Sequence, residues 1–249
     1  MAAAAKYGII SDIHANFQAL KVTLDYLNQA GVDKIMCLGD LVGYGAEPFE
    51  CIQVVRDKPD IYTIAGNHDR QVIGEKDPRM RKTATKVLEW TADNISPANA
   101  RYLKQLPQGM TVDDIFVIVH GSLLERDAYI LSPQEISKNL QAMLSDFPNF
   151  KICFFGHTHL PMLIGTKAVI TDLRETKSFQ LDKNDIYLIN PGSVGQPRDR
   201  CPLASFAIFD TQNWTVTFVR RPYDIRAAQR AIIDNGLPEK FARRLAVGV

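Results

Sequence analysis

The chain has 249 residues, of which 46% are hydrophobic and 23% are charged, and this ordinary globular balance excludes wholesale disorder and a fibrous repeat. Lys and Arg total 29 against 28 Asp and Glu, so the chain lacks the basic excess of a general nucleic-acid-binding protein. No apolar run approaches the roughly 18 residues that a membrane-spanning helix needs.

Short apolar segments alternate with helix-period segments through the first two thirds of the chain. Strands are predicted at residues 7–10, 34–38, 61–65, 115–119 and 151–155, because these segments are almost continuously hydrophobic and rich in β-branched or aromatic residues. Helices are predicted at residues 16–30, 47–56 and 78–94, after Ser96-Pro97, and from Ser132, where Glu135 completes a capping box. This alternation favours an α/β fold with largely parallel strand pairing.

The last third has a different pattern. Residues 162–170, 185–189, 203–209 and 215–219 read as strands joined by short turns, which predicts a second, more antiparallel sheet packed beside the first. Helices are predicted at residues 224–234 and 239–245. Because no linker or repeat interrupts the chain, we expect one domain over residues 1–249.

The four cysteines show no CxxC spacing. They are Cys37, Cys51, Cys153 and Cys201, and most lie in or beside apolar segments. This pattern predicts packed, reduced thiols and therefore a cytoplasmic protein.

Every histidine follows a predicted strand, in what we expect to be a loop at the edge of the sheet where ligand sites form. The histidines are His14, His68, His120, His157 and His159. Five short boxes contain them or accompany them: Asp12-Ile13-His14, Gly39-Asp40, Gly66-Asn67-His68-Asp69, His120-Gly121 and Gly156-His157-Thr158-His159. Imidazole and carboxylate together suit Mn, Fe, Zn, Co or Ni, and the set is large enough for two ions that share a carboxylate.

The order of these boxes resembles the calcineurin-like metallophosphoesterases. Longer segments such as SDIHANFQAL and NPGSVGQPRD are similar to the bacterial and archaeal single-domain phosphodiesterase type, which is grouped with diadenosine tetraphosphatases. The resemblance implies a four-layer α-β-β-α sandwich, in which two mixed sheets are flanked by helices. It also implies two divalent metal ions, with Mn²⁺ as the first candidate and Fe, Zn, Ni or Co suiting the same ligands.

The resemblance also implies a role for each box. Asp12, His14 and His159 match the ligands of a first metal ion, and Asn67, His120 and His157 match those of a second. Asp40 matches the bridging carboxylate. His68 matches a histidine that binds phosphate or protonates the leaving oxygen, with Asp69 holding its ring. In the implied mechanism, a metal-bridging hydroxide attacks phosphorus in line.

The turn-rich loop Asn190–Asp199 leaves two interpretations open. Arg198, like Asn67, is a candidate substrate-binding residue, since an arginine grips phosphate with two parallel hydrogen bonds. Alternatively, Arg198 and Asp199 pair with each other. The second box continues as Leu41-Val42-Gly43, without the Asp-Arg-Gly of protein Ser/Thr phosphatases, which weakens a phosphoprotein substrate.

The sequence therefore predicts a metal-dependent hydrolase of phosphodiester or phosphomonoester bonds in small substrates, with nucleotides among the candidates. Two alternatives remain at this point: a non-catalytic partner-binding scaffold on the same fold, and a structural protein with one metal ion. We expect neither a membrane nor general nucleic acid as a partner, and a homo-oligomer stays open.

Overall fold

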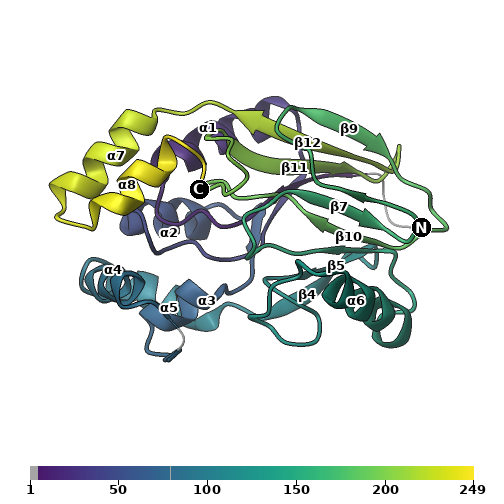
Figure 1. Ribbon diagram of the computed structural model, residues 1–249, viewed down its shortest axis with the longest axis horizontal. Coiled ribbons are helices and arrows are strands. Elements are labelled where there is room, and N and C mark those ends of the chain that lie inside the picture. The colour runs from purple at the N-terminus through teal and green to yellow at the C-terminus, as the bar shows by residue number, and fades with distance from the viewer. Residues whose placement is uncertain (1–4, 79) are drawn as a thin grey trace.

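Two six-stranded mixed sheets form the centre of the computed structural model, which describes residues 5–78 and 80–249 (Figure 1). The first sheet has the order β3 (Ile61–Thr63), β2 (Lys34–Cys37), β1 (Lys6–Ile10), β11 (Ala204–Asp210), β12 (Thr215–Arg221) and β9 (Lys177–Gln180). The second has the order β4 (Gly109–Val112), β5 (Phe116–Val119), β6 (Ile152–Phe154), β10 (Tyr187–Asn190), β7 (Met162–Gly165) and β8 (Val169–Ile170).

Parallel pairs occupy part of each sheet, and antiparallel pairs complete it. β1, β2 and β3 are parallel, as are β5, β6 and β10. Parallel neighbours need crossover connections, and helices supply several of them. The carboxyl ends of β1, β2 and β3 and of β5 and β6 therefore feed loops at the same side of the molecule, which positions the site described below.

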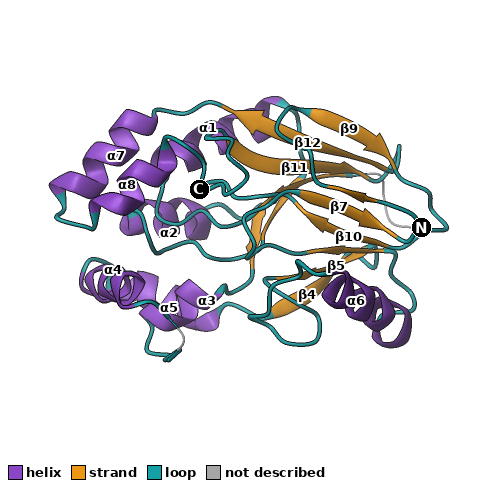
Figure 2. Cartoon of the chain, viewed as in Figure 1, coloured by secondary structure: helices purple, strands orange, loops and turns teal. Residues whose placement is uncertain are grey.

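Helices cover the outer face of each sheet (Figure 2). α1 (Phe17–Gln29) and α2 (Pro48–Asp57) pack on the first sheet, where Leu20 and Ile52 join a buried cluster with Ile10 of β1. α6 (Pro133–Asp146) packs on the second sheet, where Met143 joins Cys153 of β6. Its capping box forms as predicted, with Ser132 and Glu135 each accepting from the other's backbone N–H.

The core between the sheets follows from the two-residue period of the strands. In β1, Ile9 points into the layer shared by the two sheets and Ile10 points toward α1 and α2. Both faces of the strand are buried, which explains its continuous hydrophobicity. Phe116 and Phe154 of the second sheet fill the shared layer opposite β1.

A further group of helices lies at one end of the molecule. It comprises α3 (Asn67–Val72), α4 (Lys82–Asp93), α5 (Pro97–Gln105), α7 (Ile225–Asp234) and α8 (Glu239–Leu245). Val87 of α4 packs in one cluster with Ile232 of α7 and Phe241 of α8, so α4 and the last two helices form a joint layer.

The four-layer α-β-β-α architecture is confirmed, but the predicted division of strands between the sheets is wrong. β9, β11 and β12 join the first sheet beside the N-terminal strands, whereas β4, β5 and β6 belong to the second. The chain crosses between sheets several times. Hydrophobic periodicity is local and contains no information about which strands pair.

Some element boundaries also differ from the predictions. β4 and β9 were not predicted, because both are largely exposed edge strands without an apolar run. Residues 162–170 form the hairpin β7–β8 rather than one strand. The predicted helix 78–94 includes residue 79, which lies outside the described residues, and α4 itself begins at Lys82.

Two further predictions from the sequence concern the cysteines and membrane-spanning helices. All four cysteines are buried with free thiols, which confirms that they are packing residues. Within residues 5–78 and 80–249, no helix has both the length and the apolar character needed to cross a bilayer.

Candidate metal centre

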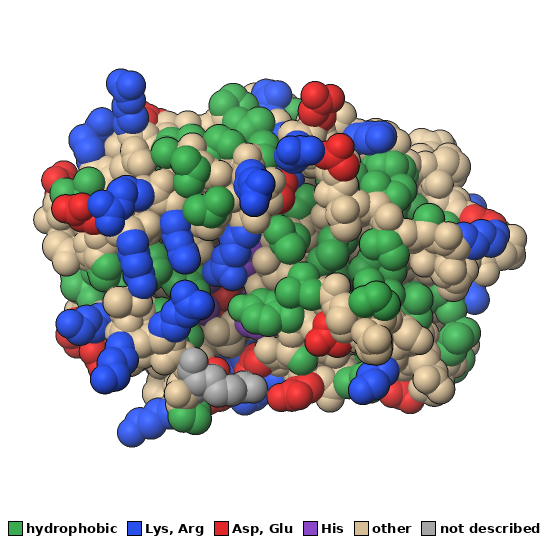
Figure 3. Space-filling view, in the orientation of Figure 1, with side chains coloured by type: hydrophobic (Ala, Val, Ile, Leu, Met, Phe, Trp, Pro, Cys, Tyr) green, Lys and Arg blue, Asp and Glu red, His purple; other side chains and the backbone are tan. Residues whose placement is uncertain are grey.

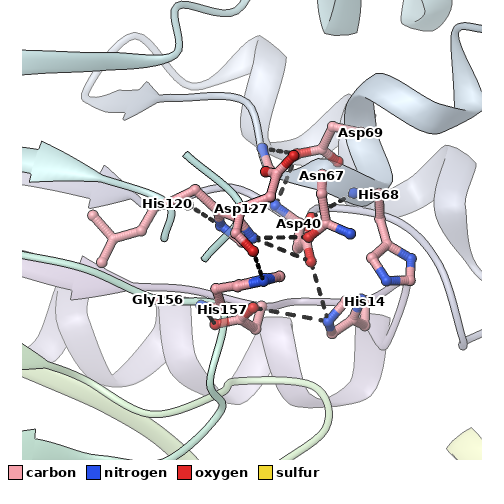
Figure 4. Close-up of polar contacts among 12 residues, drawn as sticks. His14, Asp40, Asn67, His68, Asp69, His120, Asp127, Gly156 and His157 are labelled. Carbon is pink, nitrogen blue, oxygen red and sulfur yellow. Dashed lines mark hydrogen bonds and ion pairs between the residues drawn. The ribbon is translucent and has the colours of Figure 1, made fainter. Parts of the chain in front are cut away.

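The segments that follow five strands bring the predicted ligands together in one buried cluster (Figure 4). Asp12 and His14 follow β1, Asp40 follows β2, His120 follows β5, and His157 and His159 follow β6. Asn67 and His68 follow β3 but lie in the first turn of α3, so the prediction that every histidine is in a loop fails for His68. All of these side chains are at most 8% exposed.

Backbone carbonyls fix the tautomers of three histidines. Nδ1 of His14 lies 2.9 Å from the carbonyl oxygen of Val42, Nδ1 of His120 lies 2.8 Å from that of Leu38, and Nδ1 of His159 lies 2.6 Å from that of Gln196. A carbonyl oxygen only accepts, so each Nδ1 donates, and Nε2 is the nitrogen that keeps a lone pair whenever the ring is neutral.

Those lone pairs point into the cluster. Nε2 of His14 and Nε2 of His159 lie 3.0 Å apart. Two acceptor nitrogens at this distance repel each other unless a proton or a cation lies beside both. This is the arrangement of metal-ligating histidines, whose other nitrogen donates to a carbonyl.

The two aspartates are each held through one oxygen and offer the other. Asp12 Oδ2 accepts from the backbone N–H of His157 at 3.1 Å, and its buried Oδ1 has no hydrogen-bond partner among the described residues. Asp40 Oδ1 accepts from the N–H of His68 at 2.9 Å. Its Oδ2 lies 3.6 Å from Nε2 of His14 and 3.5 Å from Nε2 of His120, between the two halves of the cluster.

Three overlapping groups in the cluster have the geometry to hold a metal ion, with ligand atoms within 4.8 Å of one another. They are Asp12, His14 and His159; Asp40, His120 and His157; and His14, Asp40 and His68. Asn67 adds an oxygen beside the second group, because its Oδ1 lies 3.2 Å from Nε2 of His120. Imidazole nitrogens and carboxylate oxygens in this number fit divalent transition metals.

Burial and mutual charge shift the pKa values in the cluster strongly. Burial raises the pKa of Asp12 to about 6. Burial alone would lower the pKa of His120, but the Asp40 carboxylate outweighs it and raises that pKa to about 9. Burial lowers the pKa of His14 and of His159 well below the usual range, which keeps both rings neutral and able to bind a cation.

His157 differs from the other three ligand candidates. Its Nε2 donates to the backbone carbonyl of Asp127 at 3.0 Å, so its Nδ1 carries the free lone pair. The ring stacks on Tyr129, with centroids 4.3 Å apart. Arg70 in turn forms a short ion pair with the Asp127 carboxylate, so α3 anchors the loop that orients His157.

His68 lies beside the cluster and faces the cleft above it. Its ring is 4.9 Å from the His14 ring and 4.6 Å from the Tyr44 ring, and its Nδ1 has no hydrogen-bond partner among the described residues. Gly43 makes room for this ring: its φ is +91°, and a Cβ there would lie 2.2 Å from Nδ1 of His68. Position 43 thus requires glycine for two independent reasons.

Asp69 does not hold the His68 ring, and that prediction is wrong. Its two oxygens accept from four backbone N–H groups instead: those of Asp40 at 2.8 Å, Leu41 at 2.9 Å, Gly66 at 3.0 Å and Val42 at 3.3 Å. Asp69 therefore joins the loop after β2 to the loop after β3. The sequence motif located the residue but did not show what its carboxylate binds.

The loop Asn190–Asp199 closes one side of the cluster. Asp199 forms a short ion pair with the buried Arg220, so the alternative in which Arg198 and Asp199 pair with each other is not the one formed. Arg198 instead reaches the Tyr44 hydroxyl at 3.4 Å and Gln196 at 3.2 Å. Its guanidinium faces the cleft.

A cleft of about 580 Å³ opens above the cluster. Asp40, Asn67, His68, His157, His159 and Arg198 line its inner part. Its outer part is lined by residues that the sequence motifs did not indicate: Arg81 and Thr83 next to or in α4, Tyr129 in the loop before α6, and Lys240 and Arg244 in α8. No local pattern marks these residues, because their proximity depends on the packing of α4 against α8.

Comparisons with known proteins identify the family of the chain. Residues 6–214 match the family model of the calcineurin-like phosphoesterase superfamily domain. A crystal structure of a metallophosphoesterase from Sphaerobacter thermophilus is 37% identical, covers 99% of this chain and 100% of its own, and superposes with a TM-score of 0.83. An uncharacterized protein of Methanocaldococcus jannaschii is 36% identical over 96% of this chain and 97% of its own length.

A shorter likeness involves an enzyme of named activity. The symmetrical bis(5′-nucleosyl)-tetraphosphatase of Actinobacillus pleuropneumoniae is 37% identical over 67 residues, which is 26% of this chain and 25% of that enzyme. The family match and the two full-length likenesses decide the classification. The chain belongs to the calcineurin-like phosphoesterase superfamily and is a metal-dependent phosphoesterase.

Proposed function

We propose that this phosphoesterase hydrolyses phosphodiester or phosphomonoester bonds of small substrates at two divalent ions held by the buried cluster. The observation that carries the proposal is the position of Asp40. Its Oδ2 lies at similar distances from Nε2 of His14 and of His120, which belong to different ligand groups. A carboxylate so placed is suited to serve two ions at once.

The remaining ligands divide between the two positions. Asp12, His14 and His159 would hold one ion, and Asn67, His120 and His157 the other. When bound, the ions would supply Lewis-acid polarisation of the phosphoryl group and activation of the attacking water. The protein contributes the fixed tautomers and the backbone hydrogen bonds that hold each ligand in place before an ion arrives.

His68 is proposed as the group that protonates the leaving oxygen or binds the phosphate. Its ring lines the cleft beside the ligands, while its Nδ1 is buried against Gly43 and has no hydrogen-bond partner among the described residues. The packing of the ring against Tyr44 and against the backbone of Gly43 fixes its direction. A general acid has to be oriented in this way before its pKa matters.

Arg198 is proposed as a phosphate-binding residue, with Asn67 contacting substrate as well as metal. Arg198 lies in the inner cleft, and Asp199 pairs with Arg220 rather than with Arg198. A guanidinium there would neutralise charge that develops on the phosphoryl oxygens.

The finer assignments stay proposals. Mn²⁺ is the first ion to test, and Fe, Zn, Ni and Co suit the same donors. We also propose that the chain works as one catalytic domain, because α8 packs on Tyr44 through Phe241 and so borders the site. A cytoplasmic location remains a prediction from the sequence, whereas the choice between monoester and diester and the oligomeric state stay open.

The test is hydrolysis of p-nitrophenyl phosphate and of bis-p-nitrophenyl phosphate by chelator-stripped protein titrated with Mn²⁺, Ni²⁺, Zn²⁺ and Mg²⁺. We expect metal-restored turnover with at least one ion, and Asp40→Asn should lose both turnover and one bound ion. Asp25→Asn, an exposed aspartate of α1, is the matched control. Full activity of the Asp40 variant contradicts the proposal. Absence of both metal and turnover in the wild type favours the scaffold alternative.

A further inference from the structure

The outer wall of the cleft carries a group of cations that the proposed chemistry at the metal cluster does not use. Arg81 immediately precedes α4, and Lys240 and Arg244 lie one turn apart on α8. All three line the same cleft as Asn67 and His68. In Figure 3, Lys and Arg side chains gather on the helical side of a hollow in which histidine is visible.

We propose that Arg81, Lys240 and Arg244 form a second anion-binding subsite, which takes a phosphate group of the substrate other than the one being hydrolysed. The proposal rests on the phosphoesterase function proposed above and names a substrate class for it. The class is phosphate esters that carry an additional phosphate group, as opposed to simple monoesters.

The packing of α8 places the subsite beside the chemistry. The Tyr44 ring contacts the His68 ring on one side, at 4.6 Å, and the Phe241 ring of α8 on another, at 5.0 Å. Lys240 and Arg244 flank Phe241 in the sequence and on the helix. Arg198 lies between the metal cluster and the proposed subsite, with its guanidinium 5.8 Å from the Tyr44 ring centre.

A bridge between α4 and α8 holds the wall together. Nζ of Lys240 donates a short hydrogen bond to Oγ1 of Thr83 and lies 4.9 Å from the Phe241 ring centre. Neither partner carries a negative charge, so Lys240 retains its full charge toward the cleft. The bridge also keeps Arg81 close to α8.

The positive charges of Arg81, Lys240 and Arg244 repel one another in the folded protein. The pKa of Lys240 lies below its usual value because of partial desolvation and the charges of Arg244 and Arg81. Desolvation and the charges of Arg198 and Arg81 lower the pKa of Arg244 in the same way. Folding therefore holds like charges together at some cost, and a bound polyanion would relieve it.

The carboxylates of the cleft do not cancel this wall. Asp40 belongs to the metal cluster, and Asp127 is paired with Arg70. Asp77 also lines the cleft and has an interaction partner of its own. Below this wall, the cleft encloses about 580 Å³, the size of pocket that holds a nucleotide-sized molecule rather than one phosphate.

The first experiment measures binding without turnover. Tripolyphosphate and inorganic phosphate are titrated into chelator-stripped protein by calorimetry, with Arg244→Gln, Lys240→Gln and Arg81→Gln as variants. We expect tripolyphosphate to bind more tightly than phosphate, and each of the first two variants to weaken it about tenfold, as a lost charge-assisted hydrogen bond does. The more exposed Arg81 should contribute less, about threefold.

Arg243→Gln is the matched control, since it removes the same charge from the same helix. Arg243 is 75% exposed and is paired with Glu239, and it does not line the cleft. Its variant should bind tripolyphosphate like the wild type. Equal weakening by the Arg243 and Arg244 variants would show bulk attraction only and overturn the subsite, as would equal affinity for phosphate and tripolyphosphate.

The second experiment separates this inference from the function on which it rests. The metal-loaded enzyme is given the p-nitrophenyl ester of thymidine 3′-phosphate, with and without a 5′-phosphate. We expect the additional phosphate to raise kcat/KM about tenfold in the wild type, and Arg244→Gln to remove that preference. Turnover of both substrates at equal kcat/KM overturns the subsite alone. No turnover of these or of p-nitrophenyl phosphate with any metal overturns the proposed function.

Discussion

The floor and the outer wall of the cleft are built by different means. The floor consists of side chains on strand ends, at most 8% exposed and tied by hydrogen bonds to backbone of other strand loops. The wall consists of long side chains on α8 and just before α4, and these two helices meet through one apolar cluster. The floor is therefore fixed by the sheets, whereas the wall depends on how the last helices pack.

This difference suggests a division of labour. A reaction that requires sub-ångström placement belongs on the floor, where hydrogen bonds to the backbone hold most of the side chains. Recognition of a charged group tolerates looser placement, because charge attraction falls off slowly with distance. Variants of the floor should therefore change kcat or the fold itself, and variants of the wall should change the choice of substrate.

The largest effect is expected from His68→Asn. Loss of a general acid should lower kcat about 10²- to 10⁴-fold, while both metal ions stay bound. The measurement is steady-state hydrolysis together with metal content by elemental analysis. Loss of one ion in this variant would instead make His68 a ligand, as the group His14, Asp40 and His68 permits, and would contradict its proposed role.

The next effect is expected from Asp69→Asn. In the wild type, both Asp69 oxygens accept from backbone N–H groups. The amide of the variant keeps one accepting oxygen, but its NH₂ group faces backbone N–H groups, which are also donors. We expect the free energy of unfolding to fall by about 2 kcal/mol, with turnover lost in proportion as the two loops separate. Urea denaturation checks the first and initial rates the second. A stable, active variant would show that the floor is not held by this carboxylate.

Gly43→Ala tests how narrowly the floor is fitted. Position 43 has positive φ, and the added Cβ would collide with the His68 ring. Displacing the ring should lower kcat about tenfold or more, since small misplacements of a reacting group are costly. Gly74→Ala shares the backbone cost, with φ at +109°, but has no atom within 4 Å of its Cβ. Equal kcat values in the two variants would contradict steric control of His68.

The smallest effect lies outside the cleft, at a contact between the sheets. Asp113 accepts from Tyr7 and from Lys34, both at 2.6 Å, and its pKa is lowered chiefly by the hydrogen bond from Lys34. A lowered folded pKa stabilises the protein above the unfolded value of about 3.9, and the stabilisation disappears as pH falls through the folded pKa. The ion pair between Asp113 and Lys34 therefore gives a pH-dependent change in stability that does not involve the metal centre.

Because Asp113 is 36% exposed, solvent screens much of this effect. Asp113→Asn should lower the free energy of unfolding by about 0.5 kcal/mol at pH 7, and the difference from the wild type should vanish once the pH falls below the lowered pKa of Asp113. Thermal melts across that range measure the difference. A difference that persists undiminished in acid would point to packing rather than charge.

Sequence reasoning located the floor and missed the wall for a physical reason. Each ligand follows a strand within a few residues, and the order of the short boxes such as Asp12-Ile13-His14 is visible along the chain. In the sequence, Lys240 and Arg244 resemble the charged residues of any solvent-exposed helix face. Only the packing of α8 against Tyr44 brings them to the cleft. For the same reason, helices and strands were mostly predicted, whereas the pairing of β11 and β12 with β1 was not.

The backbone at several of the candidate metal ligands adopts a conformation that is unfavourable for residues with a side chain. Asp12, His14, Asp40, His157 and His159 all have φ between +50° and +65°. This region costs residues with a side chain about 1–2 kcal/mol each, a cost that glycine does not bear. The loops that hold the candidate ligands therefore give up part of the stability of the fold to place these side chains in the cluster.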